Sequence, residues 1–179
     1  MNSAPPAAVI VRDATSEDAA AIAAIYAHHV SHGLATFEET PPGPAEMERR
    51  VAAVVERALP YLVSELEGIV RGFAYAAPYR ARPAYRFSVE NSVYVEPTAT
   101  RLGLGRKLLD AVVTRCTALG YRQMVAVIGD SANAGSIGLH AALGFRQAGV
   151  LRATGFKHGR WVDTVIMQRQ LGDGDATLP

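Results

Sequence analysis

One short run of this chain combines residues that suit the binding of a phosphorylated ligand. Residues 100–107 hold two glycines, Gly103 and Gly105, separated by one residue, together with three basic side chains. Glycines let backbone N–H groups turn toward a common point without a Cβ in the way. An apolar-periodic helix is predicted over residues 108–119, and a helix N-terminus carries partial positive charge. The run is therefore predicted to hold a phosphate or pyrophosphate.

Two common glycine motifs do not fit this run. A P-loop needs the pattern G-x-x-x-x-G-K-[ST], and the residues around Gly105 fail both the spacing and the hydroxyl. A dinucleotide fingerprint needs a third glycine, and Leu108 stands at that position. The run therefore does not match a P-loop or a dinucleotide-binding motif. It either binds another kind of phosphorylated molecule or is only a strand-to-helix turn.

Two side chains elsewhere could move protons. Glu90 lies in an apolar, β-branched segment, where a carboxylate costs desolvation unless it has a role or a partner. The alternatives for Glu90 are a solvated residue at the start of a strand or an ion pair with Arg86. His140 follows Asn133 by seven residues, about two helical turns, and so lies on the same helix face. A histidine titrates near neutrality and can act as acid or base, but it can equally be a packed or exposed helix residue. Asn133 itself is predicted to cap the helix.

The elements that must position these residues can be read from hydrophobic periodicity and turn signals. Strands are predicted over residues 9–11, 61–65, 69–76, 87–95, 124–128, around 150 and over 161–168. Helices are predicted over residues 15–30, 44–57, 108–119 and 133–143. Glu67-Gly68 predicts a hairpin, Thr15 to Asp18 predicts a capping box, and residues 155–160 are predicted to join the last two strands. The order βααβββαβαββ predicts a mixed α/β sheet with helices on both faces.

Composition narrows the class of protein. The 179 residues fit one domain over residues 9–171, with flexible tails at 1–8 and 172–179. A net charge of +1 gives no general surface for nucleic acid, and no apolar run approaches a membrane span. Cys116 is the single cysteine, so no intramolecular disulfide forms and a cytoplasmic location is predicted. His28 and His32 lie one helical turn apart, but neither an H-E-x-x-H carboxylate nor a third ligand accompanies them, and no metal is predicted.

Taken together, five segments resemble the phosphinothricin N-acetyltransferase branch of the GNAT N-acetyltransferase superfamily. They are residues 88–95, 101–105, 125–129, 139–144 and 155–161, and the resemblance spans about residues 9–171. The acyl-CoA loop of that superfamily reads [QR]-x-x-G-x-[GA] between the fourth strand and third helix. Thr100 departs from the pattern at its first position, and Arg101 is the candidate to supply the missing charge.

The resemblance implies a fold, a co-substrate and a set of site residues. The fold would be a mostly antiparallel sheet of about seven strands whose fourth and fifth strands splay apart. Glu90 would be the general base, and His140 would stand where many relatives carry a tyrosine that protonates the departing thiolate. The residues implied to bind acetyl-CoA are Val93, Tyr94, Val95, Arg101, Leu102, Gly103, Leu104, Gly105, Arg106, Lys107, Asn133 and Ser136. Those implied to bind the amine substrate are Phe37, Arg80, Arg82, Tyr85 and Ser92.

The implied activity is direct transfer of acetyl from acetyl-CoA to the α-amine of a small amino-acid-like molecule. Phosphinothricin, methionine sulfoximine and methionine sulfone lead, because an oxyanionic side chain suits the arginines of residues 79–86. A solvated basic loop is the alternative for that segment, and hairpin and core packing is the simplest interpretation of Trp161 and the turn beside it. A broader amine acetyltransferase and a catalytically silent acyl-CoA-binding module remain alternatives. The family implies a homodimer, without nucleic-acid or membrane partners.

Overall fold

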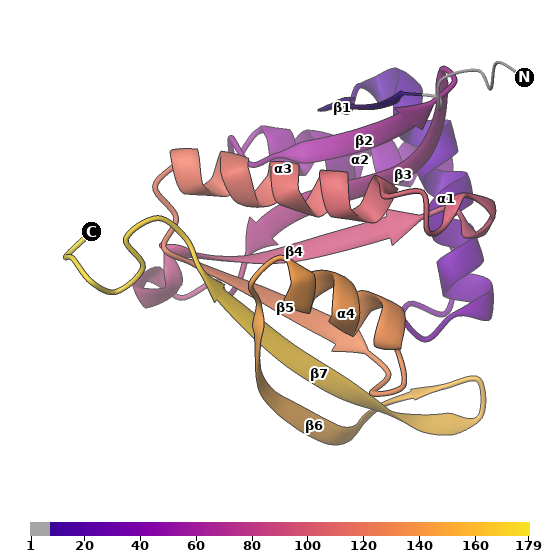
Figure 1. Ribbon diagram of the computed structural model, residues 1–179. Helices are drawn as coiled ribbons and strands as arrows, with labels where there is room; N and C mark the ends of the chain where they lie inside the picture. Colours follow the sequence, from indigo (N-terminus) through magenta and orange to yellow (C-terminus); the bar gives the residue numbers. More distant parts are fainter. Residues whose placement is uncertain (1–7) are drawn as a thin grey trace, which may run out of the picture.

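The computed structural model describes residues 8–179, and within them one seven-stranded sheet has the order β1-β2-β3-β4-β5-β7-β6 (Figure 1). Neighbouring strands are antiparallel except for β4 and β5, which are parallel. The strands are β1 (Val9–Asp13), β2 (Tyr61–Leu66), β3 (Ile69–Pro78), β4 (Ser88–Val95), β5 (Gln123–Gly129), β6 (Arg146–Lys157) and β7 (Arg160–Gln170). The helices are α1 (Ala19–His32), α2 (Pro44–Val55), α3 (Leu104–Ala118) and α4 (Ala134–Ala142). The predicted order of elements and the mixed α/β fold are confirmed.

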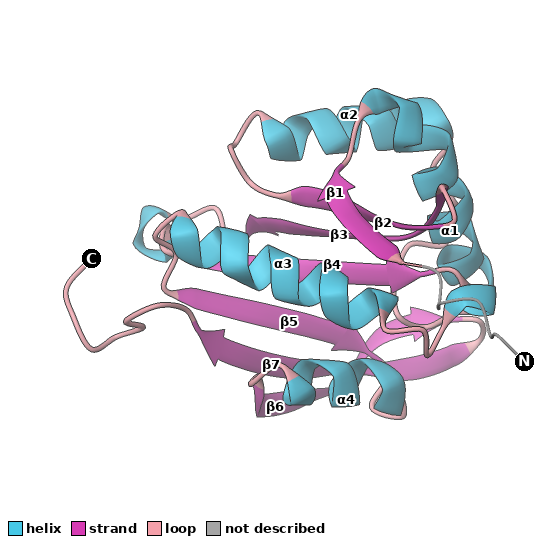
Figure 2. Ribbon diagram, turned by 45° about the horizontal axis from the view of Figure 1, so that its top comes forward, coloured by secondary structure: helices cyan, strands magenta, loops and turns pink. Residues whose placement is uncertain are grey.

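Helices cover both faces of the sheet, as Figure 2 shows. Helix α3 packs its apolar stripe, including Leu108 and Val112, on one face, and α4 lies against the same core. Helices α1 and α2 pack on the other face. Alternation along the strands supplies both cores: in β2, Leu62 faces α3 while its neighbour Val63 faces α1 and α2. The sheet is therefore buried on both sides around its centre.

The parallel pair β4 and β5 forms a fork, which is the feature of the fold that matters most for function. The two strands pair from Ser88 opposite Gln123 to Asn91 opposite Ala126, and their pairing ends there. Beyond this point β4 continues to Val95 beside β3, while β5 continues to Gly129 beside β7. The splay implied by the family resemblance is thus present, with Asn91 at the point where the strands separate.

Two boundaries differ from the sequence prediction. Helix α3 begins at Leu104 and not at residue 108, because Gly103 takes a positive φ of 81° as the residue before the helix. Strand β6 continues to Lys157, so the turn into β7 is His158-Gly159 instead of residues 155–160. An irregularity between Leu151 and Gly155 lets the long hairpin bend while it keeps its pairing.

Several local predictions hold. Asp18 accepts a hydrogen bond from the Thr15 N–H at 2.8 Å, and a short 3₁₀ turn at Ser16–Asp18 precedes α1. Glu67 and Gly68 both have positive φ, as a tight hairpin turn requires. Apart from residue 8, the predicted N-terminal tail lies outside the described residues. Residues 172–177 form turns and bends, and Arg122 donates a hydrogen bond to the Thr177 hydroxyl at 3.1 Å. None of the helices within residues 8–179 is long and apolar enough to cross a membrane.

Candidate active site

A cavity of about 530 Å³ opens at the fork between β4 and β5. The N-termini of α3 and α4 border it, and so do the last turns of α1. Of the residues predicted to bind acetyl-CoA, those at the cavity are Val93, Tyr94, Val95, Arg101, Gly103, Leu104, Gly105, Arg106, Asn133 and Ser136. Ser92 and His140 line it as well. Residues that are distant in sequence are therefore brought together around one space.

The first turn of α3 provides the anion-binding geometry predicted from the glycine run. The first intrahelical bond comes from the Lys107 N–H to the Gly103 carbonyl at 3.1 Å, so the N–H groups of Leu104, Gly105 and Arg106 have no partner within the helix. Gly105 packs closely, since a Cβ there would lie 3.3 Å from the Leu139 side chain. The cavity thus meets a helix N-terminus with free donors.

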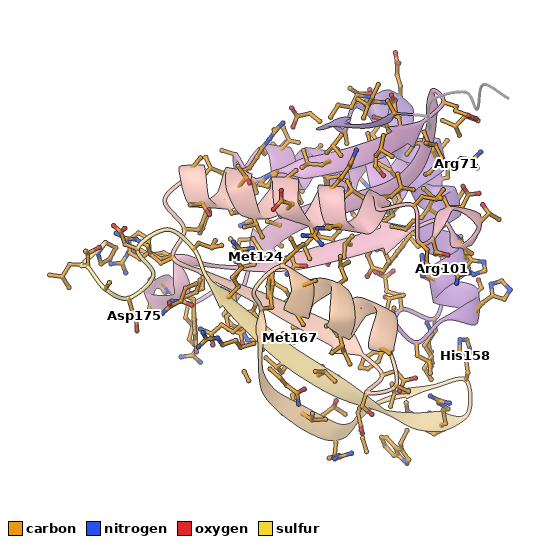
Figure 3. The ribbon with its side chains drawn as sticks, viewed as in Figure 1. Arg71, Arg101, Met124, His158, Met167 and Asp175 are labelled. Carbon is orange, nitrogen blue, oxygen red and sulfur yellow. The ribbon has the colours of Figure 1, made fainter. Side chains whose placement is uncertain are left out.

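The basic residues of this run point in different directions. Arg101, which Figure 3 labels near α1, has a positive φ of 64° and lines the cavity, as does Arg106. Lys107 instead donates to the Val9 carbonyl at 3.4 Å, and neither Lys107 nor the exposed Leu102 lines the cavity. Thr100, at the position where the family pattern departs, donates its hydroxyl to the Pro97 carbonyl at 3.1 Å. Arg101 and Arg106 are the two cations placed to meet an anion here.

The C-terminal half of β4 has backbone N–H and C=O groups that do not pair with β5. Val93, Tyr94 and Val95 lie beyond the fork, where only β3 pairs with the strand. The Val95 carbonyl is already bonded to Nε2 of His29 at 2.9 Å. His29, on α1, also lines the cavity and was missed by the sequence analysis, which considered only its neighbours His28 and His32. No signal in its own segment separates it from them.

Glu90 and Ser92 lie on the face of β4 that is turned toward α1 and α2. Val89 and Asn91 belong to the opposite face, as strand alternation requires. Burial raises the pKa of Glu90 and the nearby Arg80 lowers it, with burial the larger effect. The ion pair with Arg86 considered from the sequence is not formed, because Arg86 donates to the Pro83 carbonyl and stacks on Phe87. Within residues 8–179, the Glu90 carboxylate has no hydrogen-bond partner, so its oxygens are available to accept a proton from a bound substrate.

His140 is buried, with 2 % of its surface exposed, on the other face of the sheet. Its Nε2 lies 3.0 Å from Oδ1 of Asn91, and its Nδ1 lies 2.8 Å from the Ser136 carbonyl. The Phe145 ring meets it edge to face at 5.0 Å. Burial lowers the pKa of His140, and the Ser136 carbonyl raises it by a smaller amount. The exposed alternative considered for this histidine is wrong.

The start of α4 is built as predicted. Oδ1 of Asn133 accepts from the Ser136 N–H at 3.1 Å, which caps the helix. Both residues border the cavity. Since the cap uses the Asn133 oxygen, its amide nitrogen, 3.5 Å from the Gly129 carbonyl, is the part with donor capacity to spare.

The residues predicted to bind the amine lie outside this cavity, apart from Ser92. Arg80, Arg82 and Tyr85 are exposed on the segment between β3 and β4, as the solvated-loop alternative describes. Phe37 lies over β6, where a Cβ on Gly155 would come within 2.5 Å of its ring. The segment that carries Phe37 therefore lies against the β6–β7 hairpin.

Two side chains of the β6–β7 hairpin lie in environments that their residue types do not indicate. Lys157 is 1 % exposed and donates from Nζ to the Thr36 carbonyl at 2.8 Å, so it ties β6 to the segment that carries Phe37. Trp161 is 67 % exposed and pairs edge to face with Phe156 at 5.2 Å, so the prediction that it packs in the core is wrong.

His28 and His32 stack on each other at 4.8 Å. Among the residues that the structure describes, no group of three metal-binding side chains is present.

The chain belongs to the GNAT acetyltransferase family, because the model of the acetyltransferase (GNAT) domain matches residues 11–166. Within that family it is 55 % identical over 172 residues to a phosphinothricin N-acetyltransferase of Alcaligenes faecalis, covering 96 % of this chain and 87 % of the relative. An L-methionine sulfoximine/L-methionine sulfone acetyltransferase of Salmonella typhimurium is 40 % identical, covering 91 % of this chain and 95 % of the relative.

A solved structure agrees with both. A GNAT superfamily phosphinothricin acetyltransferase from Sinorhizobium meliloti in complex with AcCoA matches with a TM-score of 0.92 and 52 % identity. The match covers 96 % of this chain and 92 % of that one. The family resemblance inferred from the sequence motifs is therefore confirmed.

Proposed function

We propose that this protein transfers acetyl from acetyl-CoA to the α-amine of an amino-acid-like substrate of the phosphinothricin, methionine sulfoximine or methionine sulfone type. The relatives named for these substrates cover nearly the whole chain at 40 to 55 % identity. The observation that carries the proposal is the fork between β4 and β5, which has Glu90 on one face and His140 on the other. An acetyl group held at the fork would meet a base and an acid from opposite sides.

The co-substrate would occupy the cavity of the fork. Its pyrophosphate would bind the free N–H groups at the start of α3, with Arg101 and Arg106 beside them. The pantetheine arm would run along the unpaired edge of β4, in the manner of an added strand, and reach Asn133 and Ser136. A solved relative contains AcCoA, which supports this choice of ligand.

The chemistry needs proton transfers at two places, the amine and the departing thiolate. An α-amine with a pKa near 8 is about nine-tenths protonated at pH 7, so a base must first take a proton from the ammonium group. Glu90 would do so directly or through water, and its raised pKa brings it closer to the operating pH. The free amine attacks the thioester carbon, its nitrogen gives up a second proton to solvent, the C–S bond breaks, and the CoA thiolate leaves. His140 would give this thiolate a proton, which makes the products an N-acetyl amide and CoA thiol.

The transfer would pass directly between the two substrates. Cys116 is the single thiol, and it is buried between α3 and the sheet. Burial raises the pKa of that thiol to about 12, so it stays protonated and unreactive. No acyl-enzyme is therefore proposed, and kinetics with both substrates varied should give intersecting and not parallel lines.

Arg80 and Arg82 are proposed to recognise the oxyanions of the acceptor, with Phe37, Tyr85 and Ser92 around its side chain. Arginine forks match carboxylate and phosphinate oxygens. The segment that holds both arginines leads directly into β4 and therefore into Glu90. Because the arginines are exposed, they would become ordered only when a substrate or a partner surface covers them.

The test is release of CoA thiol from acetyl-CoA with phosphinothricin, methionine sulfoximine, methionine sulfone, a series of ordinary L-amino acids, spermidine and a peptide amine. Turnover that is fastest with the first three supports the proposal. Turnover confined to spermidine and the peptide would overturn the assignment of the substrate.

One broader activity has a specific observation in its favour. An L-amino acid N-acyltransferase of Escherichia coli is 39 % identical, covering 91 % of this chain and 94 % of the relative. Comparable turnover across ordinary L-amino acids would favour that activity. Thermal stabilisation by acetyl-CoA with no thiol release for any amine would favour a silent binding module instead.

A homodimer in the cytoplasm is also proposed. The pair Phe156 and Trp161, together with Leu151, leaves an exposed apolar surface on the β6–β7 hairpin at one edge of the sheet. A second copy covering it would lie close to the Phe37 segment, since Phe37 contacts Gly155 on the same hairpin. Sedimentation at micromolar concentration tests the assembly, and a monomer there would contradict it.

A further inference from the structure

The side chain of Asn91 is held by hydrogen bonds at both ends of its amide. It is 5 % exposed, and it lies at the last position of β4 that pairs with β5. Its amide nitrogen donates to the Val125 carbonyl on β5 at 3.2 Å, and its Oδ1 lies 3.0 Å from Nε2 of His140. One amide thus joins the two strands and α4 at the point where the cavity opens.

The orientation of this amide follows from the chemistry of its neighbours. The Val125 carbonyl can only accept a hydrogen bond, so the NH₂ group of Asn91 must face it. The carbonyl oxygen of Asn91 then faces His140, and it too can only accept. If the amide turned over, two oxygens would meet at Val125 and a buried acceptor would lose its donor, which is unfavourable. Nε2 of His140 therefore needs a proton to bond with Asn91.

The other ring nitrogen faces an acceptor as well. Nδ1 of His140 is 2.8 Å from the Ser136 carbonyl, and the Ser136 hydroxyl is 3.4 Å away. The charged ring can donate to both acceptors. The neutral ring with its proton on Nε2 keeps the bond to Asn91 but turns the lone pair of Nδ1 toward the Ser136 carbonyl at 2.8 Å, so only the charged ring satisfies both acceptors. The opposite tautomer would set the lone pairs of Nε2 and Oδ1 against each other at 3.0 Å.

We propose that Asn91 is a positioning residue that keeps a proton on Nε2 of His140, the ring nitrogen beside the fork. The groups that hydrogen-bond or stack on the ring come from β4, α4 and the residue before β6: Asn91, Ser136 and Phe145. None of these is a charged side chain. The proton on Nε2 is thus held by neutral acceptors alone, against a burial that favours loss of the charge.

The consequence for catalysis rests on the proposed function, in which His140 protonates the CoA thiolate. A ring whose only proton sat on Nδ1 would present a lone pair to the fork and could not donate there. With Asn91 and Ser136 both accepting from the charged ring, His140 would pass its Nε2 proton to the thiolate and be left neutral, with its remaining proton on Nδ1 bonded to the Ser136 carbonyl. This role is comparable to that of any group that fixes a histidine tautomer by bonding to the ring.

The first measurement needs no variant at position 91. Long-range ¹H–¹⁵N spectra of the full chain report which nitrogen of each histidine carries the proton, and His140→Gln identifies the His140 signals among the five histidines. We expect Nε2 of His140 to be protonated throughout the neutral range. A wild-type ring protonated on Nδ1 alone would overturn the proposal, whether or not the enzyme is active.

Two variants of similar shape then separate positioning from packing. Asn91→Leu removes the acceptor, so the His140 proton should move to Nδ1 and the pKa of the ring should fall; kcat should drop about tenfold while KM for acetyl-CoA stays within about twofold. Asn91→Asp keeps an oxygen at the ring and should keep the proton on Nε2. His29, which bonds Val95 and not Asn91, is the internal control and should not change.

The outcomes are distinct. An unchanged His140 tautomer in Asn91→Leu would overturn the proposal, and so would loss of the Nε2 proton in Asn91→Asp. If Asn91→Leu does not fold, Asn91→Asp and the wild-type spectrum still decide. Failure of the wild type to release CoA with any amine would instead refute the proposed function, and the spectra would stand independently of that result.

Discussion

Glu90 and Asn91 are neighbours in β4, yet the two faces that they serve are built in opposite ways. On the Glu90 face the carboxylate is half-buried, has no hydrogen-bond partner among residues 8–179, and has Arg80 as its nearby charge. On the Asn91 face His140 is buried and both of its ring nitrogens have partners. The Glu90 carboxylate is therefore free to bind a substrate, whereas both ring nitrogens of His140 already have hydrogen-bond partners.

This difference indicates which half of the reaction each face serves. Acceptor amines vary in size and charge, and a carboxylate that is free and close to exposed arginines can meet them by small adjustments. The thiolate of CoA never varies, so its proton donor can be fixed in advance by Asn91 and Ser136. Preorganised groups of this kind avoid reorganisation during the reaction.

Of the variants predicted here, Glu90→Gln should have the largest effect on turnover. Loss of the base should lower kcat on the order of a hundredfold, while the affinity for acetyl-CoA stays nearly constant. Because the carboxylate has no partner to lose, the thermal stability should stay the same or rise slightly. Thiol-release kinetics and a melting curve check both. A near-wild-type rate would remove Glu90 from the mechanism.

His140→Ala should behave differently on the second count. We expect kcat to fall by about tenfold to a hundredfold, and the protein to lose about 1–3 kcal/mol of stability, because Oδ1 of Asn91 is left buried without a donor. Denaturant titration of this variant beside Glu90→Gln measures the contrast. Equal stability of the two variants would contradict the claim that only one face is prebuilt.

Arg80→Ala sharpens the description of the Glu90 face. The base must be ionised, so kcat/KM should rise with pH through the pKa of Glu90. Arg80 lowers that pKa, so its removal should move the acid limb of the profile to higher pH. Arg82→Ala is the matched control, since Arg82 has no such effect on Glu90 and should change KM for the amine without moving the limb. Identical limbs in wild type and Arg80→Ala would refute the coupling.

The smallest effect is expected at the edge of the acetyl-CoA cavity. Arg101→Ala should weaken acetyl-CoA binding about threefold, as suits one exposed charge near a phosphate, and the loss should shrink in high salt. Lys107→Ala is the control, because Lys107 is bonded to the Val9 carbonyl away from the cavity. Calorimetric titration of both variants compares them. Equal losses would mean that the charge acts at long range and not through contact.

Much of the site could be predicted because its signals are local. The glycine run, the Asn133 cap and the Glu67-Gly68 turn depend on residues within a few positions of one another, and all three adopt the expected geometry. Glu90 was identifiable because a carboxylate is conspicuous in an apolar strand. The contacts of three other side chains could not be predicted, because their partners are distant in sequence. Asn91 bonds Val125, 34 residues away. His29 bonds Val95 at a separation of 66 residues, and Lys157 bonds Thr36 at 121.

The sequence alone determined the order of elements, the acyl-CoA loop and the family, because hydrophobic period, turn chemistry and motif spacing are properties of short segments. Only the tertiary structure decided that β4 and β5 separate after Asn91, that Glu90 and His140 face opposite sides, and that Trp161 lies on the surface. The physical reason is that the position and role of a buried polar group depend on which distant group completes its hydrogen bonds. That pairing exists only once the sheet has formed.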